Sequence, residues 1–284
     1  MRLRTLPLSV AGIIVGNMAS YNTETFSWTI TTLALLTVLA LQTVSNLANE
    51  LGDTIKHADA QDRQGPKRGI QTGKVTKREI ATLIVIFSAL SAAAGLALIA
   101  VSLGGLFTLQ SIIFVAFGAL CIAAAIYYTL GKKPYGYMCL GDISVFLFFG
   151  LMSVLGVYYL QCKIIELYML LPATSIGALS VAVLNVNNMR DMPSDLRANK
   201  RTLALCMGMR GARIYQATLI IVTIITWGLF AGWKIIIPFV PIWGYHVYKC
   251  FITSGSALDK QLPLVSLTTM TLAIVYAISV LFIS

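Results

Sequence analysis

The sequence predicts an all-α membrane protein with nine transmembrane helices. Of its 284 residues, 57% are hydrophobic and only 11% are charged, and the mean hydropathy is +0.81. Soluble domains carry about 25% charged residues. Apolar runs of about 20 residues, long enough to cross a bilayer as a helix, recur along the chain, and the basic residues gather in alternate connections between them.

The same composition excludes other classes of protein. A disordered chain would combine low hydrophobicity with high charge, and a β-barrel would show alternating segments of about 10 residues. The net charge of +10 would suggest nucleic acid in a soluble protein. Here it is explained by loop topology, so no nucleic-acid partner is expected. The five cysteines form no CxxC pair, which disfavours a zinc site or a disulfide framework.

The nine expected spans make up a single domain over residues 1–284. The connections after the first, third, fifth and seventh spans are short, whereas two connections on the other side, 50–79 and 188–213, are the longest in the chain. Long connections in a compact domain are often functional. The spans cover about residues 5–20, 28–50, 80–103, 108–129, 140–160, 166–187, 212–231, 235–252 and 264–283.

The basic residues predict the orientation of these spans. Of the 21 Lys and Arg residues, only Lys163 and Lys234 lie on the side of the short connections, and the other nineteen lie on the opposite side. Cytoplasmic loops collect Lys and Arg, so the side with nineteen is expected to face the cytoplasm. The amino terminus is then inside and the carboxyl terminus outside.

Two acidic clusters stand at the cytoplasmic ends of spans two and six. In the first, Asn49 and Asp53 are four residues apart and share a helical face if the helix continues that far. In the second, Asn188, Asp191 and Asp195 are three and four residues apart, which again places them on one helical face. Further polar residues surround these five: Lys56, Asp59 and Arg63 after the first, and Arg190, Lys200 and Arg201 around the second.

Oxygen ligands from Asn and Asp suit Mg²⁺, which takes one or two carboxylates and completes its shell with water and substrate phosphates. Two facing clusters predict Mg²⁺ sites that bridge a diphosphate, with Asn49, Asp53, Asp59, Asn188, Asp191 and Asp195 as ligands. The diphosphate is expected to be neutralised by Lys56, Arg63, Lys132, Arg190, Lys200 and Arg201. The alternative is that both clusters are ordinary solvated loops. Ionisable groups at the level of the membrane favour a functional site over this alternative.

Three further residues allow two interpretations each. Tyr128 and Lys132 have the spacing YxxxK at the end of span four, which fits either a site or an interfacial Tyr with a snorkelling Lys. Asp142 opens span five, either as an acid that favours the helix start or as a side chain that faces a cavity. All three are candidate catalytic residues.

With these motifs, the chain resembles the UbiA superfamily of intramembrane prenyltransferases. The superfamily has an Asn/Asp-rich motif after span two, a DxxxD motif after span six and YxxxK after span four, which here are 49–59, 191–195 and 128–132. Finer segments resemble the 1,4-dihydroxy-2-naphthoate polyprenyltransferases: 4–7, 46–49, 62–69, 133–137, 141–150 and 184–203. The chain departs from the pattern at Glu50, where Asp is usual, and in the few residues before Arg4.

The resemblance implies nine helices around a central cavity, with a cytoplasmic cap of loops and short helices. It implies a Mg²⁺-dependent transfer of a polyprenyl group from polyprenyl diphosphate to 1,4-dihydroxy-2-naphthoate, with loss of CO₂ and diphosphate, to give demethylmenaquinone. Asp142 would act on the naphthoate as a general base, and the bilayer would supply the lipid substrate. The rivals are a relative with another acceptor, such as 4-hydroxybenzoate, haem or a chlorophyll precursor, and a membrane transporter.

Overall fold

The computed structural model describes residues 5–56, 69–70 and 73–283. Helices account for nearly all the regular structure in these ranges, beside one isolated bridge between Met138 and Arg201. The longer helices are α1 (Leu6–Met18), α2 (Trp28–Ile55), α3 (Lys77–Leu103), α4 (Leu109–Tyr127), α6 (Ser153–Cys162), α7 (Leu170–Arg197), α8 (Leu203–Ala231), α10 (Val240–Ile252) and α11 (Gln261–Ile283).

Short elements extend several of these helices. The fifth span runs through α5 (Gly141–Val145), the π-helical segment η3 (Phe146–Met152) and α6. The 3-10 turn η4 (Leu167–Met169) precedes α7, and η6 (Gly255–Lys260) precedes α11. Before α10 stand α9 (Trp233–Ile236) and η5 (Ile237–Phe239), and η2 (Tyr135–Tyr137) lies in the connection between α4 and α5.

Eight helices or helix runs in the described chain are long and apolar enough to cross a membrane. They coincide with eight of the nine predicted spans. The first predicted span, residues 5–20, contains α1, a helix of 13 residues, which is shorter than the roughly 20 residues that a crossing needs. The prediction of an all-helical membrane protein is confirmed, and the ninth crossing stays a prediction.

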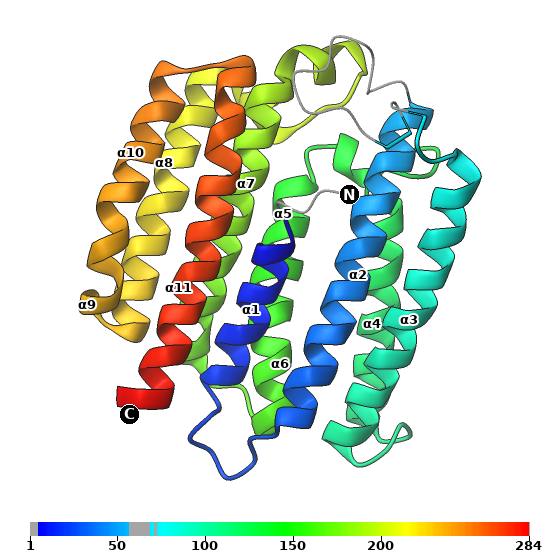
Figure 1. The fold of residues 1–284 in the computed structure, drawn as a ribbon, viewed down its shortest axis with the longest axis vertical. Coiled ribbons are helices and arrows are strands. Elements are labelled where there is room, and N and C mark those ends of the chain that lie inside the picture. The colour runs from blue at the N-terminus through cyan, green and yellow to red at the C-terminus, as the bar shows by residue number, and fades with distance from the viewer. Residues whose placement is uncertain (1–4, 57–68, 71–72, 284) are drawn as a thin grey trace.

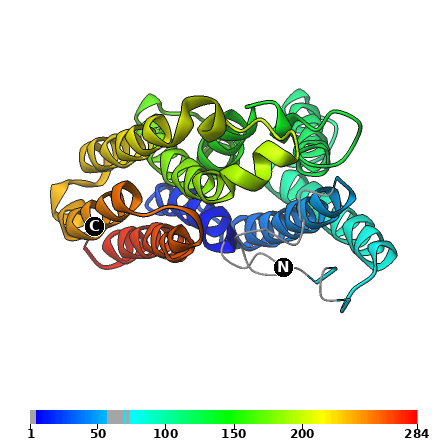
Figure 2. The same cartoon turned by 90° about the horizontal axis from the view of Figure 1, so that it is seen from above.

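The helices form two rows when the molecule is seen from above (Figure 2): α10, α11, α1, α2 and α3 in one, and α8, α7, the fifth span and α4 in the other. The helix α7 packs against α8 and η3 in its own row and against α1 and α11 in the other. It is the most buried of the membrane-length helices. Figure 1 shows α2, α7 and α10 ending where α3, α8 and α11 begin, at one end of the bundle.

Both acidic clusters are helical, which differs from the prediction of two long loops. The helix α2 continues to Ile55, so Asn49 and Asp53 share a helical face as the spacing predicts. The helix α7 continues to Arg197 and includes Pro193. Residues 188–197 are therefore a helix end, and only residues 198–202 connect α7 to α8.

Close packing of backbones fixes the fifth span against α7. A Cβ atom built on Gly150 would lie 2.6 Å from the carbonyl oxygen of Ala173 and 2.7 Å from the Cα of Gly177. A Cβ on Gly177 would lie 2.8 Å from the ring of Phe146. Small residues let membrane helices approach in this way, since the bilayer provides little hydrophobic drive for their association.

We expect Gly150→Ala to force these helices apart and to destabilise the protein by about 1–3 kcal/mol, the usual cost of overpacking. Thermal unfolding of the purified protein in detergent measures the change. Gly156→Ala is the matched control, because a Cβ at that position meets no atom within 4 Å. Equal unfolding temperatures for the two variants would contradict the proposed close contact.

Candidate active site

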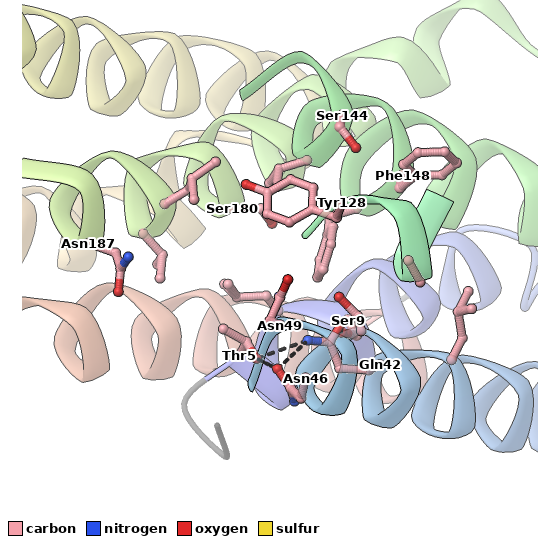
Figure 3. A pocket seen from close by; sticks show the side chains of 18 of the residues that line it. Thr5, Ser9, Gln42, Asn46, Asn49, Tyr128, Ser144, Phe148, Ser180 and Asn187 are labelled. Atoms are coloured by element: carbon pink, nitrogen blue, oxygen red, sulfur yellow. Dashed lines mark hydrogen bonds between the residues drawn. The ribbon is translucent and has the colours of Figure 1, made fainter. Parts of the chain in front are cut away.

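A cavity of about 500 Å³ lies between the helices that carry the two acidic clusters. Its lining comes from α1, α2, α4, η2, the fifth span, α7 and α11. At the cluster end it is lined by Asn49, Glu50, Tyr128, Asn187 and Arg190. Figure 3 shows Asn49 extending from α2 toward the side on which Tyr128 lies. The central cavity that the resemblance implies is therefore present in the described structure, and of the predicted metal ligands that the structure describes, Asn49 lines it.

The wall opposite α2 is apolar and aromatic. It includes Val145, Phe148 and Phe149 of the fifth span and Val183 and Leu184 of α7. Phe148 and Phe149 belong to the π-helical segment η3. Such segments are rare and are frequent at functional sites. This wall suits a hydrocarbon or a flat aromatic ligand.

A polar stripe on α2 lines the facing wall. Ser9 Oγ donates to Gln42 Oε1 at 2.9 Å, Gln42 Nε2 donates to Thr5 Oγ1 at 2.9 Å, and Thr5 Oγ1 donates to Asn46 Oδ1 at 3.2 Å. The bonds among Thr5, Gln42 and Asn46 are drawn in Figure 3. Polar groups inside a membrane are costly, and these bonds orient them at the cavity.

Sequence reasoning missed this stripe, although a signal was present. Gln42, Asn46, Asn49 and Asp53 follow one another at intervals of four, three and four residues. That spacing places all four on one face of a helix, so the first cluster continues into the membrane as a polar line.

The connection between α4 and α5 joins the two clusters through Tyr137. Its hydroxyl donates to Asp53 Oδ1 at 2.9 Å. The ammonium groups of Lys56 and Lys200 lie over its ring, 5.4 and 5.5 Å from the centroid. Tyr137 thus contacts one cation from each cluster and a carboxylate from the first, a role that the sequence did not predict.

The carboxylates of the two clusters lie close enough to interact. Asp195 interacts electrostatically with both Asp191 and Asp53, and all three are buried. Lys200 Nζ lies 3.3 Å from Asp195 Oδ1. Asp195 Oδ2 is buried and has no hydrogen-bond partner among the described residues. A buried carboxylate oxygen of this kind requires a counter-charge or a ligand.

Arg190 holds the second cluster in place. Its Nε and Nη2 donate to the two oxygens of Asp191 at 2.8 and 2.6 Å. Its Nη1 donates to Asp259 of η6 at 2.7 Å, and Nη2 also donates to Asn187 at 2.8 Å. Two-point contacts between Arg and a carboxylate fix geometry as well as charge, so Arg190, predicted as a phosphate ligand, also orients Asp191.

These groups fit Mg²⁺ by their chemistry. No three His, Cys, Asp or Glu side chains form a ready-made metal cluster within the ranges that the structure describes. Mg²⁺ does not need one, because it takes one or two carboxylates together with waters and substrate phosphates. The unpartnered oxygen of Asp195 and the oxygen-only set of Asn49, Asp53, Asn188 and Asp191 meet that requirement.

Other predicted site residues are distributed around this end. Asp59 and Arg63 lie outside the described residues. Lys132 is exposed, and its carbonyl oxygen accepts a hydrogen bond from Lys56 Nζ at 3.4 Å. Arg201 is exposed, and its backbone pairs with the α4–α5 connection. Asn188 is buried on α7.

Tyr128 lines the cavity and packs edge-to-face against Tyr135, with ring centroids 5.3 Å apart. Its hydroxyl lies next to Gly141, since a Cβ built there would stand 2.7 Å from that oxygen. The tyrosine of the YxxxK pair is therefore at the site, whereas Lys132 does not line the cavity.

Asp142 is not among the residues that line the cavity described above, so its inward orientation stays a prediction. Its neighbours Ser144 and Val145 line the cavity. In the helix α5, Val145 is three residues after Asp142 and shares a face with it, whereas Ser144 does not. Asp142 is buried and interacts electrostatically with Tyr215 of α8. Its Oδ1 has no hydrogen-bond partner within the described chain.

Comparisons of this chain with known proteins agree on one family. The model of the UbiA prenyltransferase family matches residues 9–261. The 1,4-dihydroxy-2-naphthoate octaprenyltransferase of Escherichia coli (strain K12) is 41% identical over 92% of this chain and 82% of its own length. The enzymes of the same name from Haemophilus influenzae and Mycobacterium tuberculosis are 43% and 39% identical, over 81% and 80% of this chain and 75% of their own lengths.

Two solved structures have the same fold. A UbiA homolog from Aeropyrum pernix aligns with a TM-score of 0.72 at 15% identity, over 99% of this chain and 98% of its own. A UbiA homolog from Archaeoglobus fulgidus, bound to DMAPP and Mg²⁺, aligns with a TM-score of 0.65 at 16% identity, over 100% and 98%. The family model, the relatives and the fold agree that this chain belongs to the UbiA prenyltransferase family.

Proposed function

We propose that the protein transfers a polyprenyl group from polyprenyl diphosphate to 1,4-dihydroxy-2-naphthoate and releases diphosphate and CO₂, a step of menaquinone biosynthesis that yields demethylmenaquinone. The observation that carries this proposal is the 39–43% identity, over most of the chain, to relatives named for this activity. The electrostatic interaction of Asp195 with Asp53 and Asp191, carried by two helices that line the cavity, supports it.

Two rival functions fit less well. A relative that uses 4-hydroxybenzoate, haem or a chlorophyll precursor would share the fold, but the relatives reported above bear the name of the naphthoate enzyme. A transporter would hold its carboxylates near the bilayer midplane on broken helices. Here Asp53 and Asp195 lie near the ends of the long helices α2 and α7, where a headgroup-level diphosphate site is needed.

The acidic end of the cavity is the proposed diphosphate site. Asn49, Asp53, Asn188, Asp191 and Asp195 would hold Mg²⁺, and Asp59 is proposed to join them. When bound, Mg²⁺ would neutralise charge on the diphosphate and make it a better leaving group. The proposed cations for the remaining charge are Lys56, Arg63, Lys132, Arg190, Lys200 and Arg201.

The apolar part of the cavity is the proposed place for the reacting ends of the two organic substrates. Phe148, Phe149 and the aliphatic side chains beside them exclude water, which protects an allylic cation from hydrolysis. Cleavage of the allylic C–O bond yields that cation, the electron-rich naphthoate ring attacks it, and the ring carbon that gains the prenyl group loses its carboxyl group as CO₂.

The acceptor is proposed to be activated by Asp142 as general base, with Tyr128 and Lys132 as further catalytic residues. The unpartnered Oδ1 of Asp142 supports a role beyond packing. To act as a base, this carboxylate has to reach the acceptor either directly or through a bridging group. A base of this kind typically contributes 10²–10⁴-fold.

The membrane arrangement is part of the same proposal. We infer that the chain, as one domain over residues 1–284, crosses a bacterial inner membrane nine times, with α1 as the first crossing. The amino terminus would be cytoplasmic and the carboxyl terminus outside. The connections at the cluster end would form a cytoplasmic cap, and the lipid substrate would enter from the bilayer.

Membranes that contain the protein should convert labelled polyprenyl diphosphate and 1,4-dihydroxy-2-naphthoate into prenylated product, with CO₂ released in step, and only when Mg²⁺ is present. Asp53→Asn and Asp191→Asn should each lower turnover on the order of 10²-fold or more, because several kcal/mol of charge stabilisation are lost. A panel of other aromatic acceptors, including 4-hydroxybenzoate, tests the choice of substrate.

Asp259→Asn is the control for this series. Asp259 also binds Arg190 but lies outside the proposed Mg²⁺ ligands, so this variant should keep most of its turnover. Full activity in both the Asp53 and the Asp191 variants would remove the basis for a two-cluster metal site. Preferred use of another acceptor would show that the rival function is correct.

Asp142→Asn should lower product formation by about 10²–10⁴-fold and leave the binding of polyprenyl diphosphate nearly unchanged. Tyr215→Phe, which removes a hydroxyl that interacts with the same carboxylate, should have a small effect on both. The two measurements are product formation and equilibrium binding of the labelled diphosphate. Unchanged product formation in Asp142→Asn would leave Asp142 with only a structural role.

Single cysteines introduced into a variant whose native cysteines are replaced by alanine test the orientation. Positions Lys133 and Asn199 should react only with reagents that reach the cytoplasm, and position Asn22 only from outside. All three native side chains are exposed, whereas the buried Ser194 is unsuitable as a label site. Labelling of Asn22 and Asn199 positions from the same side would contradict the odd number of crossings.

A further inference from the structure

Two cysteines from distant parts of the chain meet at the cluster end of the bundle. Cys139 Sγ and Cys206 Sγ lie 2.9 Å apart, although 67 residues separate them in sequence. Both are free thiols. A disulfide bond requires a sulfur–sulfur separation of about 2.05 Å, so a shift of less than 1 Å would bring the two atoms to bonding distance.

The two cysteines lie on segments that are already joined through their backbones. Cys139 N donates to the carbonyl oxygen of Arg201 at 2.9 Å, and Arg201 N donates to the carbonyl oxygen of Tyr137 at 3.2 Å. Cys206 follows in the first turns of α8, before the break in that helix at Gly208, where φ is +67°. Cys139 itself has a φ of +59°, which marks a sharp turn in the connection.

This junction is part of the site described above. Tyr137, two residues before Cys139, donates to Asp53, and Lys200, beside Arg201, lies over the Tyr137 ring and near Asp195. The segment 137–139 therefore contacts Asp53 of the first cluster and Lys200 beside the second. Two backbone hydrogen bonds and one cation–π contact join it to residues 200–201, and the sulfur atom of Cys139 adjoins that of Cys206.

The two thiols differ in their readiness to react. Partial burial and the neighbouring thiol raise the pKa of Cys139 to about 11. Cys206 is exposed and is the one that a reagent in solution reaches first. The thiolate is the reactive form of cysteine, so oxidation is expected to begin at Cys206.

We propose that Cys139 and Cys206 form a redox-modification site, in which a small-molecule disulfide oxidises the pair and the resulting bond locks the 137–139 segment onto α8. The Cys206 thiolate attacks one sulfur of the reagent and releases one equivalent of the reagent thiol. The Cys139 thiol then loses its proton and attacks the Cys206 sulfur, which releases the second equivalent. Two electrons pass from the pair to the reagent.

The disulfide bond between Cys139 and Cys206 is expected to affect turnover, an inference that rests on the prenyl transfer proposed above. In the reduced protein the segment 137–139 can part from residues 200–201 by breaking two hydrogen bonds and one cation–π contact, which would let diphosphate leave the acidic clusters. In the oxidised protein a covalent bond prevents this separation. Oxidation should therefore lower kcat several-fold, and reduction should restore it.

The first test is chemical and needs no activity. The full-length protein, purified in detergent and reduced, is titrated with oxidised glutathione, and its disulfides are mapped by mass spectrometry of unreduced peptides. Two of the five thiols should disappear together, and a peptide pair containing Cys139 and Cys206 should appear. Cys139→Ser and Cys206→Ser should each abolish the pair, while Cys121→Ser, on the separate helix α4, should retain it.

A stable glutathione adduct on Cys206 without the internal bond would overturn the proposal, and so would a bond to any other cysteine. The second test compares kcat of reduced, oxidised and re-reduced protein, with Cys206→Ser as the variant that should not respond. An unchanged kcat in protein shown to carry the bond would overturn the lock. Inactive reduced protein would instead count against the proposed function, while the thiol titration would still report on the pair.

Discussion

The electrostatic interaction of three buried carboxylates, Asp53, Asp191 and Asp195, is the constraint on which the rest of this structure depends. Like charges repel strongly where water is excluded. The protein offsets this repulsion with Arg190 on Asp191 and Lys200 on Asp195, and with the Tyr137 hydroxyl on Asp53. The compensation at Asp195 is incomplete, because one of its oxygens has no partner in the described chain. A cation is the simplest group to complete it.

The helices that carry the clusters also form the cavity. Both α2 and α7 line it, and its two walls are unlike. The polar stripe of α2 is held by hydrogen bonds to α1, and the opposite wall is made by the π-helical segment η3. Glycines at the contact between this span and α7 let the aromatic wall lie close to the second cluster.

Much of this could be predicted from the sequence, because the signals are local. Eight spans follow from runs of apolar residues that must satisfy their backbone groups as helices in lipid. The helical period alone places Asn49 and Asp53 on one face of their helix, and it does the same for Asn188, Asp191 and Asp195. The extent of these helices could not be predicted, because helix propensity only weakly marks where a helix ends. Residues 188–197 were therefore expected to be a loop.

The sequence by itself determined the class of protein, the helical faces of its motifs and the candidate diphosphate site, since these depend on composition and on spacing within one helix. The tertiary structure decided which distant groups meet. The contacts of Tyr137 with Asp53 and Lys200, of Arg190 with Asp259, and of Cys139 with Cys206 join segments that no periodicity relates. The close contact of the fifth span with α7 brings Ser144 and Val145 to the cavity wall, a placement that the motif alone does not reveal.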